Sequence, residues 1–317
     1  MKQNRMLSLL VLAVLALTLA LPQCAFAEAA VEEQALLTNS EINIRDPFII
    51  TYEGKYYMYG TEGENAFSGH QNRFLVYVGE DLQTWEGPYT IYENDGSFWA
   101  DKQYWAPAMF VRDGVFYFYG AMGGSSRDTK GIFLFMAEDP LGPFAPVSDE
   151  PITQWEEDAI DAEIFEEDGK TYMVYTKGME GFYCGELNEG LDAFVGETWK
   201  LFDVNGCGWS QPMFGNNILN DGAALLKTED GRLLCFFSTT GPNGYNMGYA
   251  VSDNGKLSGN WECTANRMLV GASGGHNMFF TSLNGDVMTA YHCPNFPGRP
   301  TFKYVKVAQS GEIFFVD

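Results

Sequence analysis

Short stretches of apolar and aromatic residues recur along this chain, and each is interrupted by a polar turn that contains glycine. The repeated pattern is an apolar run, then Asp-Gly or a related pair, then a second run rich in Tyr, Phe, Met and Val. Asp-Gly and Asn-Gly pairs favour the turns with positive φ that join adjacent antiparallel strands. No long stretch has apolar residues at the i, i+3, i+4 and i+7 positions of an amphipathic helix. The pattern therefore predicts an all-β protein.

Five copies of this strand–turn–strand unit follow one another at nearly constant spacing. Their central glycines are Gly54, Gly114, Gly169, Gly231 and Gly285. Successive glycines are 60, 55, 62 and 54 residues apart. Each unit has room for about four strands, which is the size of a propeller blade. A β-sandwich does not explain five such copies. We therefore predict a single five-bladed β-propeller over residues 28–317, with the segment from Thr301 onward completing the last blade.

The first 27 residues have the composition of a secretory signal peptide. Lys2 and Arg5 form a short positive start, the run from Leu7 to Leu21 is almost wholly apolar, and Ala25-Phe26-Ala27 supplies the small-x-small pattern. The apolar run is shorter than the roughly 20 residues that a membrane span needs. We expect cleavage before Glu28 and a secreted protein, either extracellular or periplasmic.

Acidic residues outnumber basic ones, so that the formal net charge is −23 at pH 7. Such a surface repels nucleic acid and anionic membranes, and we expect neither as a partner. It also argues against a polyanionic substrate. Five cysteines remain after the leader, and an odd number cannot pair fully within one chain. The cysteines are Cys184, Cys207, Cys235, Cys263 and Cys293. The sequence leaves the pairing of one disulfide open.

Carboxylates and a histidine recur near the start of the first strand in the repeated units. The first strand of every propeller blade lines the central axis, so residues at its start gather at one end of the channel. Counting eight to ten positions back from each turn glycine gives Asp46, Ala106, Asp161, Asp221 and His276. Like charges held close raise each other's pKa and cost stability, so three converging acids indicate a functional site. Paired carboxyl groups suit glycoside hydrolysis, in which one activates water and another protonates the leaving oxygen.

Several short motifs resemble those of the family 43 glycoside hydrolases. They are Arg45-Asp46-Pro47-Phe48, Tyr104-Trp105-Ala106-Pro107, Ile160-Asp161 and Gly274-Gly275-His276, with Gly79 to Trp85 as an outer-strand signature. The resemblance runs from about residue 41 to the C-terminus. It implies a five-bladed propeller, in agreement with the repeat count. It also implies hydrolysis with inversion by three acids.

The resemblance assigns roles to the three acids. Asp46 would be the general base, and Asp161 would tune the pKa of its partner and orient it. The family's general acid is usually a Glu followed by Gly-Pro, but Asn220-Asp221-Gly222 stands at that place here, so Asp221 is the candidate. Because Asp is one methylene shorter than Glu, Glu163 and Glu180 remain alternatives for the acid.

Aromatic and basic residues near the expected mouth of the channel are candidates for substrate binding, because aromatic rings suit the apolar C–H faces of sugars. The candidates are Trp99, Tyr104 and Trp105, together with Arg45 and Arg299. No cofactor is expected to be required. His276 is the candidate metal ligand, and a structural Ca²⁺ at the propeller centre stays open, since the sequence identifies no set of oxygen ligands for it.

Three functional hypotheses follow. The leading one is an inverting glycoside hydrolase that cleaves α-L-arabinofuranosyl or β-D-xylosyl linkages in a plant-type oligo- or polysaccharide. The second is a degenerate propeller that binds glycans without cleaving them, which Ala108 and the Glu-to-Asp change at Asp221 favour. The third, a fructan-cleaving propeller of a neighbouring family, fits the Arg45-Asp46-Pro47-Phe48 motif less well. The sequence leaves the glycan and the choice between internal and terminal attack open.

Overall fold

The structure is a computed structural model that describes residues 35–64, 66–67, 71–268 and 272–317. These residues form β-strands and two short 3₁₀ turns, η1 (Trp155–Glu157) and η2 (Val204–Gly206), without an α-helix. The predicted leader, residues 1–27, lies outside the described residues. Within the part of the chain that is described, no helix is long and apolar enough to cross a membrane.

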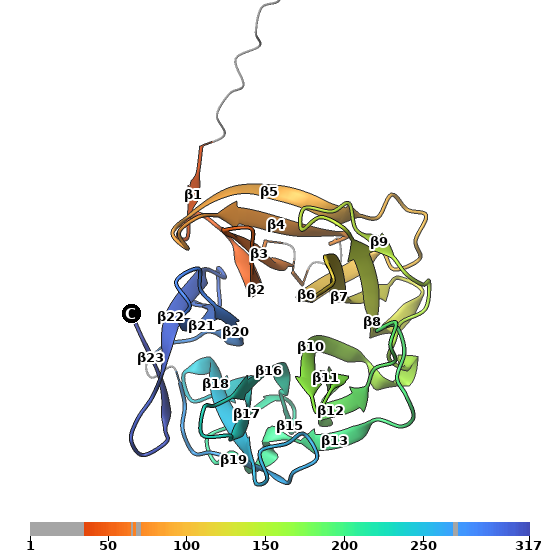
Figure 1. Cartoon of the computed structure of the whole chain (residues 1–317). Coiled ribbons are helices and arrows are strands. Elements are labelled where there is room, and N and C mark those ends of the chain that lie inside the picture. Colours follow the sequence, from red (N-terminus) through yellow and green to blue (C-terminus); the bar gives the residue numbers. More distant parts are fainter. Residues whose placement is uncertain (1–34, 65, 68–70, 269–271) are drawn as a thin grey trace, which may run out of the picture. The chain divides into compact units, whose positions relative to one another are not determined.

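Five sheets surround a common axis, so the predicted five-bladed propeller is confirmed (Figure 1). Blade 1 has the order β1-β5-β4-β3-β2, and in blades 2 to 5 the strands pair in sequence order. The strands of blades 1 and 2 are β1 (Leu37–Thr38), β2 (Ile44–Tyr52), β3 (Lys55–Glu62), β4 (Arg73–Gly79), β5 (Thr84–Glu93), β6 (Lys102–Arg112), β7 (Val115–Gly124), β8 (Arg127–Ala137) and β9 (Ala145–Pro146).

Blades 3 to 5 follow in the same manner, with a small two-stranded sheet between blades 3 and 4. The strands of blade 3 and of the small sheet are β10 (Ala159–Glu167), β11 (Lys170–Lys177), β12 (Gly181–Glu186), β13 (Trp199–Phe202), β14 (Pro212–Phe214) and β15 (Asn217–Ile218). Blades 4 and 5 contain β16 (Asp221–Lys227), β17 (Leu233–Gly241), β18 (Gly244–Ser252), β19 (Trp261–Cys263), β20 (Gly275–Thr281), β21 (Val287–His292), β22 (Pro300–Val307) and β23 (Ile313–Val316).

The turn chemistry that predicted the repeat is found in all five blades. Each central glycine lies between the first two strands of its blade and has a positive φ, from 77° at Gly169 to 89° at Gly231. This backbone region favours glycine because a Cβ atom makes it unfavourable for other residues. The last two strands, β22 and β23, complete blade 5 as the sequence predicted.

Aromatic side chains from the repeated strands fill the spaces between blades. Phe74 of blade 1 packs edge-on against Phe118 of blade 2, with ring centroids 4.7 Å apart. Phe236 of blade 4 packs against Phe279 of blade 5 in the same way, at 4.9 Å. Offset and edge-on aromatic pairs contribute packing energy beyond the area that they bury. The abundant aromatic residues of the sequence therefore pack neighbouring blades against one another.

The sequence left the disulfide unassigned, and the structure pairs Cys207 with Cys263. Cys207 follows η2, and Cys263 ends β19, so the bond ties the segment between blades 3 and 4 to the outer strand of blade 4. Among the residues described, Cys184 and Cys235 are buried free thiols, and Cys293 is a partly exposed one.

Candidate active site

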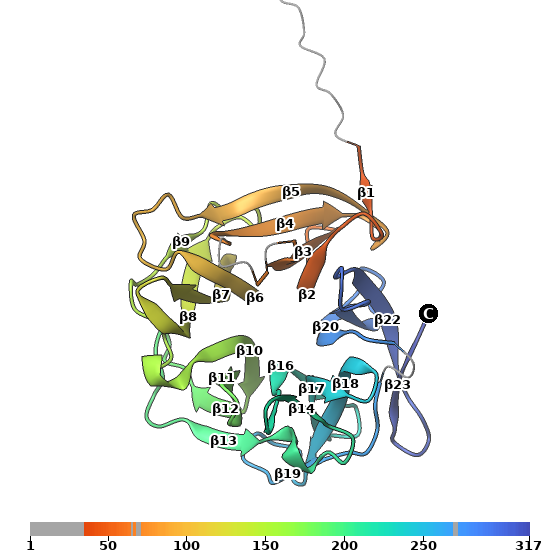
Figure 2. The same cartoon turned by 180° about the vertical axis from the view of Figure 1, so that it is seen from behind.

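The innermost strands of the five blades, β2, β6, β10, β16 and β20, lie around the axis (Figures 1 and 2). Each of them contains a β-bulge near its start, where its register with the second strand of the blade shifts. A bulge re-aims the side chains of a strand and is common beside active sites. The first bulge residue has a positive φ in every blade. These residues are Asp46 (φ 51°), Ala106 (φ 40°), Asp161 (φ 60°), Gly222 (φ 61°) and His276 (φ 55°).

The bulges correct one detail of the sequence comparison. The spacing from the turn glycine predicts that Asp221 is equivalent to Asp46 and Asp161, but the residue in that structural position is Gly222. Asp221 lies one residue earlier and still pairs with Ser238 of β17. Its side chain therefore leaves the backbone from a different point of the bulge than those of the other two acids. Gly222 also has to be small, because an added Cβ would lie 2.9 Å from the His276 ring.

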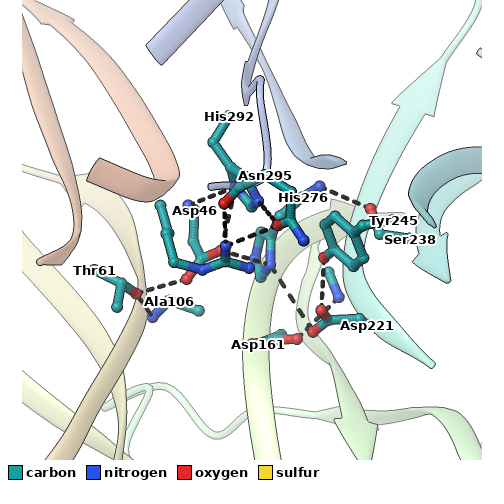
Figure 3. A network of polar contacts seen from close by, with 12 residues as sticks. Asp46, Thr61, Ala106, Asp161, Asp221, Ser238, Tyr245, His276, His292 and Asn295 are labelled. Atoms are coloured by element: carbon teal, nitrogen blue, oxygen red, sulfur yellow. Dashed lines mark hydrogen bonds and ion pairs between the residues drawn. The ribbon is translucent and has the colours of Figure 1, made fainter. Parts of the chain in front are cut away.

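Asp46 is held in a buried and positively polarised environment. Its Oδ2 accepts a hydrogen bond of 2.6 Å from the Thr61 hydroxyl, and its Oδ1 lies 3.2 Å from His276 Nδ1 (Figure 3). Burial by itself would raise the pKa of this carboxyl group. The charges of His276 and Arg45 and the Thr61 hydrogen bond outweigh burial, so the pKa of Asp46 is lowered. Asp46 is therefore ionised in the folded protein at neutral pH.

Asp221 has the opposite electrostatic character. It accepts a hydrogen bond of 2.6 Å from the Tyr245 hydroxyl, and it is hydrogen-bonded to Asp161. Burial and the nearby charge of Asp161 raise the pKa of Asp221 well above its usual value. Burial also raises the pKa of Asp161, although a hydrogen bond of 2.9 Å from Gly222 N–H opposes this. The pair therefore retains a proton, which places a carboxylic acid and the ionised Asp46 in one site.

These residues line a pocket with a volume of about 540 Å³, which we call the main pocket because it contains all three acids. Arg45, Trp105 and His276, predicted from the sequence, are at this pocket together with the three acids. Two exposed rings stand at the rim, Phe67 at 63% and Phe296 at 64% exposure. The pocket thus combines charged groups at its base with apolar side chains around its walls.

Three predicted binding residues do not line this pocket. Tyr104 is fully buried in the core between blades 1 and 2, and its hydroxyl donates to the Ala100 carbonyl over 2.5 Å, so the prediction that it contacts substrate is corrected. Trp99 packs against Trp155, with centroids 4.8 Å apart, and is absent from the lining residues that the structure describes. Arg299 is absent as well and donates to the Ile42 carbonyl over 2.6 Å.

The two alternative acids also lie away from the pocket. Glu163 lines a small axial cavity beneath it, of about 20 Å³, which is room for roughly one water molecule. Burial there raises the pKa of Glu163 to about 8. Glu180 is 60% exposed at its side chain and accepts a hydrogen bond from Tyr183. Of the three candidates for the general acid, Asp221 is therefore the one that lines the same pocket as Asp46.

The predicted metal ligand His276 does form a cluster with two carboxylates. Ligand atoms of Asp161, Asp221 and His276 lie within 4.8 Å of one another. Ca²⁺ takes six to eight oxygen ligands, however, and this cluster supplies two carboxyl groups and one imidazole. The two carboxyl groups are moreover hydrogen-bonded to each other through a retained proton. The donor set of this cluster therefore fits Ca²⁺ poorly.

Three residues of the site were missed by the sequence analysis. Thr61 and His292 lie at the ends of β3 and β21 and touch Asp46, while Tyr245 of β18 touches Asp221. The axial positions predicted from the repeat all belong to the first strand of a blade, whereas these three residues come from second and third strands. Their signal in the sequence was weak, because a Thr, a His or a Tyr in a strand is common without a catalytic role.

Comparisons with known proteins agree with this geometry. The family model described as "Glycosyl hydrolases family 43" matches residues 40–308. The curated protein named beta-D-galactofuranosidase xynD, from Aspergillus niger, is 26% identical over 272 residues, covering 78% of this chain and 73% of that protein. Xylosidase/arabinosidase 43A from Humicola insolens is 30% identical over 167 residues, covering 48% of this chain and 47% of that protein.

Solved structures show the same fold. The endo-arabinase from Bacteroides thetaiotaomicron superimposes with a TM-score of 0.79 at 23% identity, covering 86% of this chain and 98% of that chain. The α-L-arabinofuranosidase from Lactobacillus brevis gives a TM-score of 0.71 at 20% identity, covering 86% and 93% of the two chains.

Proposed function

Because the chain belongs to the glycosyl hydrolases of family 43 and is thus a glycoside hydrolase, we propose that it cleaves α-L-arabinofuranosyl or β-D-xylosyl linkages with inversion. The observation that carries this proposal is that Asp46 and Asp221 line the same pocket, where the charges of His276 and Arg45 lower the pKa of Asp46 while burial and Asp161 raise that of Asp221. Hydrolysis by inversion requires one carboxylate and one carboxylic acid on opposite sides of the scissile bond.

Each acid has one role in this mechanism. Asp46 accepts a proton from a water molecule as that water attacks the anomeric carbon. Asp221 gives its proton to the leaving glycosidic oxygen. Asp161, hydrogen-bonded to Asp221, keeps the proton on that residue and orients it. The water adds its oxygen to the sugar, and the aglycone leaves as an alcohol, so that atoms and charge balance over the two carboxyl groups.

The spacing of the two carboxyl groups is compatible with inversion. Inverting enzymes hold the pair roughly 6.5–9.5 Å apart to leave room for water. His276 Nδ1 lies 3.2 Å from Asp46 Oδ1 and 3.9 Å from Asp221 Oδ1. These two oxygens are therefore no more than about 7 Å apart, a limit that includes the lower part of the inverting range.

The substrate class rests on the relatives and on the pocket. The names of similar proteins include a galactofuranosidase, a xylosidase/arabinosidase and an endo-arabinase. These names share pentosyl or furanosyl substrates. A pocket of about 540 Å³ with aromatic walls has room for more than a single sugar ring. The alternative of a glycan-binding propeller without activity is not favoured, because a protein that only binds glycans does not need a proton-sharing pair of acids beside Asp46.

The test is hydrolysis of a panel by the mature protein beside Asp46→Asn and Asp221→Asn. The panel contains arabinan, arabinoxylan, xylan, galactan and levan, with the 4-nitrophenyl glycosides of α-L-arabinofuranose, β-D-xylose and β-D-galactofuranose. We expect cleavage of an arabinosyl or xylosyl substrate and losses of about 10²–10⁴-fold in each variant. Proton NMR at early times should show the inverted anomer first. Binding to a glycan without cleavage of any would overturn the proposal.

We also propose that the protein is secreted. The leader pattern of residues 1–27 and the Cys207–Cys263 disulfide both support this, since disulfides persist in oxidising compartments. Mass spectrometry of the protein from culture medium should give an N-terminus at Glu28. Full-length protein retained in the cytoplasm would contradict the proposal.

A further inference from the structure

The five bulges around the axis are linked to one another by a repeated side-chain position. In each blade, the last first-strand residue that is paired before the bulge lies opposite one residue of the second strand, which we call the bulge partner. These partners are Thr61, Ala121, Thr176, Ser238 and His292. They are far apart in sequence, but the fold makes them equivalent. Thr61, Ser238 and His292 each lie next to the bulge of the following blade, with blade 1 following blade 5.

Three of these partners accept a hydrogen bond across the gap between blades. The Thr61 hydroxyl accepts the Ala106 N–H of blade 2 over 2.7 Å, and the Ser238 hydroxyl accepts the His276 N–H of blade 5 over 2.7 Å. His292 Nδ1 of blade 5 accepts the Asp46 N–H of blade 1 over 3.1 Å. In every case the bonded amide belongs to the first bulge residue, which the register shift separates from its strand partner.

The remaining two partner positions make no such hydrogen bond among the described residues. Ala121 has no polar side-chain atom, and the Thr176 hydroxyl is buried without a partner. The bulge amide of blade 4, Gly222 N–H, is bonded to the carboxylate of Asp161. A side chain thus accepts the bulge amides of Asp46, Ala106, Gly222 and His276. A buried amide without a partner costs roughly 1–3 kcal/mol.

His292 differs from the other partners because it accepts a hydrogen bond from the amide of the proposed general base and is itself held in place by neighbouring side chains. It is fully buried, and burial lowers its pKa to about 3, so the ring is neutral. Since Nδ1 accepts from Asp46, Nε2 carries the hydrogen and donates to Asn295 Oδ1 over 3.1 Å. Asn295 also accepts two hydrogen bonds of 2.8 Å from Arg45. The Tyr245 ring stacks on His292 with centroids 5.5 Å apart.

The hydrogen bond between His292 and the Asp46 amide lies at the junction where the last blade meets the first and the propeller ring closes. In the part of the chain that is described, no strand of blade 5 is paired into the sheet of blade 1. The two blades meet through the apolar packing of β2 against β20 and β21, and through the loop of residues 293–299 that follows β21. Gly298 accepts the Ile44 N–H over 3.1 Å, and Arg299 bonds the Ile42 carbonyl. The position of the first blade's bulge is thus set by side chains and loop atoms of the last blade.

We propose that His292 is a positioning residue for catalysis: it holds the backbone of Asp46 in its left-handed conformation, with Asn295 fixing the imidazole tautomer. The inference rests on the proposed function of Asp46 as general base. A non-glycine residue at φ 51° is costly and persists only where its surroundings enforce it. Without the His292 acceptor, the Asp46 amide loses its partner and the carboxylate shifts from its place in the pocket. Arg299 closes the same blade junction without touching the base.

The test compares His292→Leu, His292→Asn and Arg299→Met with the wild type on the substrate that the panel identifies. We expect His292→Leu to lower kcat on the order of 100-fold, since displacements of ~1 Å cost that much, with little change in KM. His292→Asn should recover much of this loss, because its Oδ1 places an acceptor near the position of Nδ1. Arg299→Met should lower the melting temperature and leave kcat within about twofold of wild type.

Two results would overturn the inference: wild-type kcat in His292→Leu, or equal losses in His292→Leu and His292→Asn. A crystal structure of His292→Leu provides a readout that does not depend on activity. There, Asp46 should leave its φ near +50°, and an unchanged Asp46 would refute the positioning role even if the wild type hydrolysed nothing on the panel. An inactive wild type with a displaced Asp46 in the variant would instead reject the proposed function and retain the positioning.

Discussion

Tyr245 donates its hydroxyl hydrogen to Oδ2 of Asp221 over 2.6 Å, and both side chains line the same pocket. The two residues come from different strands of blade 4, β18 and β16, so Asp221, the proposed acid, is held from within its own blade. The same Tyr245 ring stacks on His292, which contacts Asp46. One aromatic side chain therefore contacts both Asp221, the proposed acid, and the histidine that accepts from Asp46, the proposed base.

Removing the Tyr245 hydroxyl should weaken catalysis more than stability. We expect Tyr245→Phe to lower kcat roughly five- to tenfold, because a hydrogen bond worth about 1 kcal/mol no longer orients Asp221. Tyr104→Phe is the matched control, since it removes the same group from a core position whose hydroxyl bonds Ala100. That control should lower the free energy of unfolding by about 1 kcal/mol with unchanged kcat. Equal kinetic effects in both variants would contradict the assignment.

The pH dependence of kcat/KM should be bell-shaped. Activity should fall on the acid side as Asp46 becomes protonated, below its usual pKa of 3.8, because its pKa is lowered in the fold. Activity should fall on the alkaline side as Asp221 loses its proton, well above 3.8, because its pKa is raised. The alkaline limb belongs to the coupled Asp161–Asp221 pair rather than to one residue.

Replacing Asp221 distinguishes the acid limb of the pH profile from the alkaline limb. In Asp221→Asn, the residual hydrolysis of a 4-nitrophenyl glycoside, whose leaving group needs little protonation, should keep the acid limb and lose the alkaline one. An alkaline limb that survives in Asp221→Asn would assign the general acid to another residue.

Glu163 should make the folded state less stable as the pH rises. Its pKa is about 8 in the fold and 4.5 in the unfolded chain, so the folded state binds the extra proton between these values and loses that advantage as the pH increases. Relative to Glu163→Gln, the wild type should lose up to about 1.4 kcal/mol of unfolding free energy per pH unit between pH 5 and 7. Urea unfolding at several pH values measures this difference.

Activity provides the second readout for the same variant. Glu163 lines the axial cavity and not the main pocket, so Glu163→Gln should keep its catalytic rate at the pH optimum. A loss comparable to that of Asp221→Asn would return Glu163 to the position of general acid.

The Cys207–Cys263 disulfide should contribute to stability through the 56-residue separation of its ends, since a cross-link restricts the unfolded chain. We expect the double variant Cys207→Ser/Cys263→Ser to lose about 2–4 kcal/mol of unfolding free energy. Cys293→Ser, which removes a partly exposed free thiol, is the control and should change stability much less. Thermal unfolding with and without reductant should reproduce the difference for the wild type alone.

The repeat architecture could be predicted because it depends on short-range chemistry. The Asp-Gly turn at Gly169 and its counterparts are specified by neighbouring residues, and the alternation of turn and strand at constant spacing repeats that information five times. The convergence of Asp46, Asp161 and His276 followed from the repeat, since equivalent positions of a propeller meet at its axis. A wrong expectation such as Tyr104 arose where two neighbours, Tyr104 and Trp105, were treated alike although they point to opposite sides of β6.

Local spacing along the chain encodes the number of blades, the family motifs and the strands that carry the acids, so these could be predicted without the structure. The tertiary structure alone decided that Asp221 stands one residue before its bulge, that His292 serves the amide of Asp46, and that Cys207 pairs with Cys263. These relationships join different blades or depend on a shift in strand register. They are fixed by how the sheets pack around the axis, and no spacing along the chain records which side chains that packing brings within hydrogen-bonding distance.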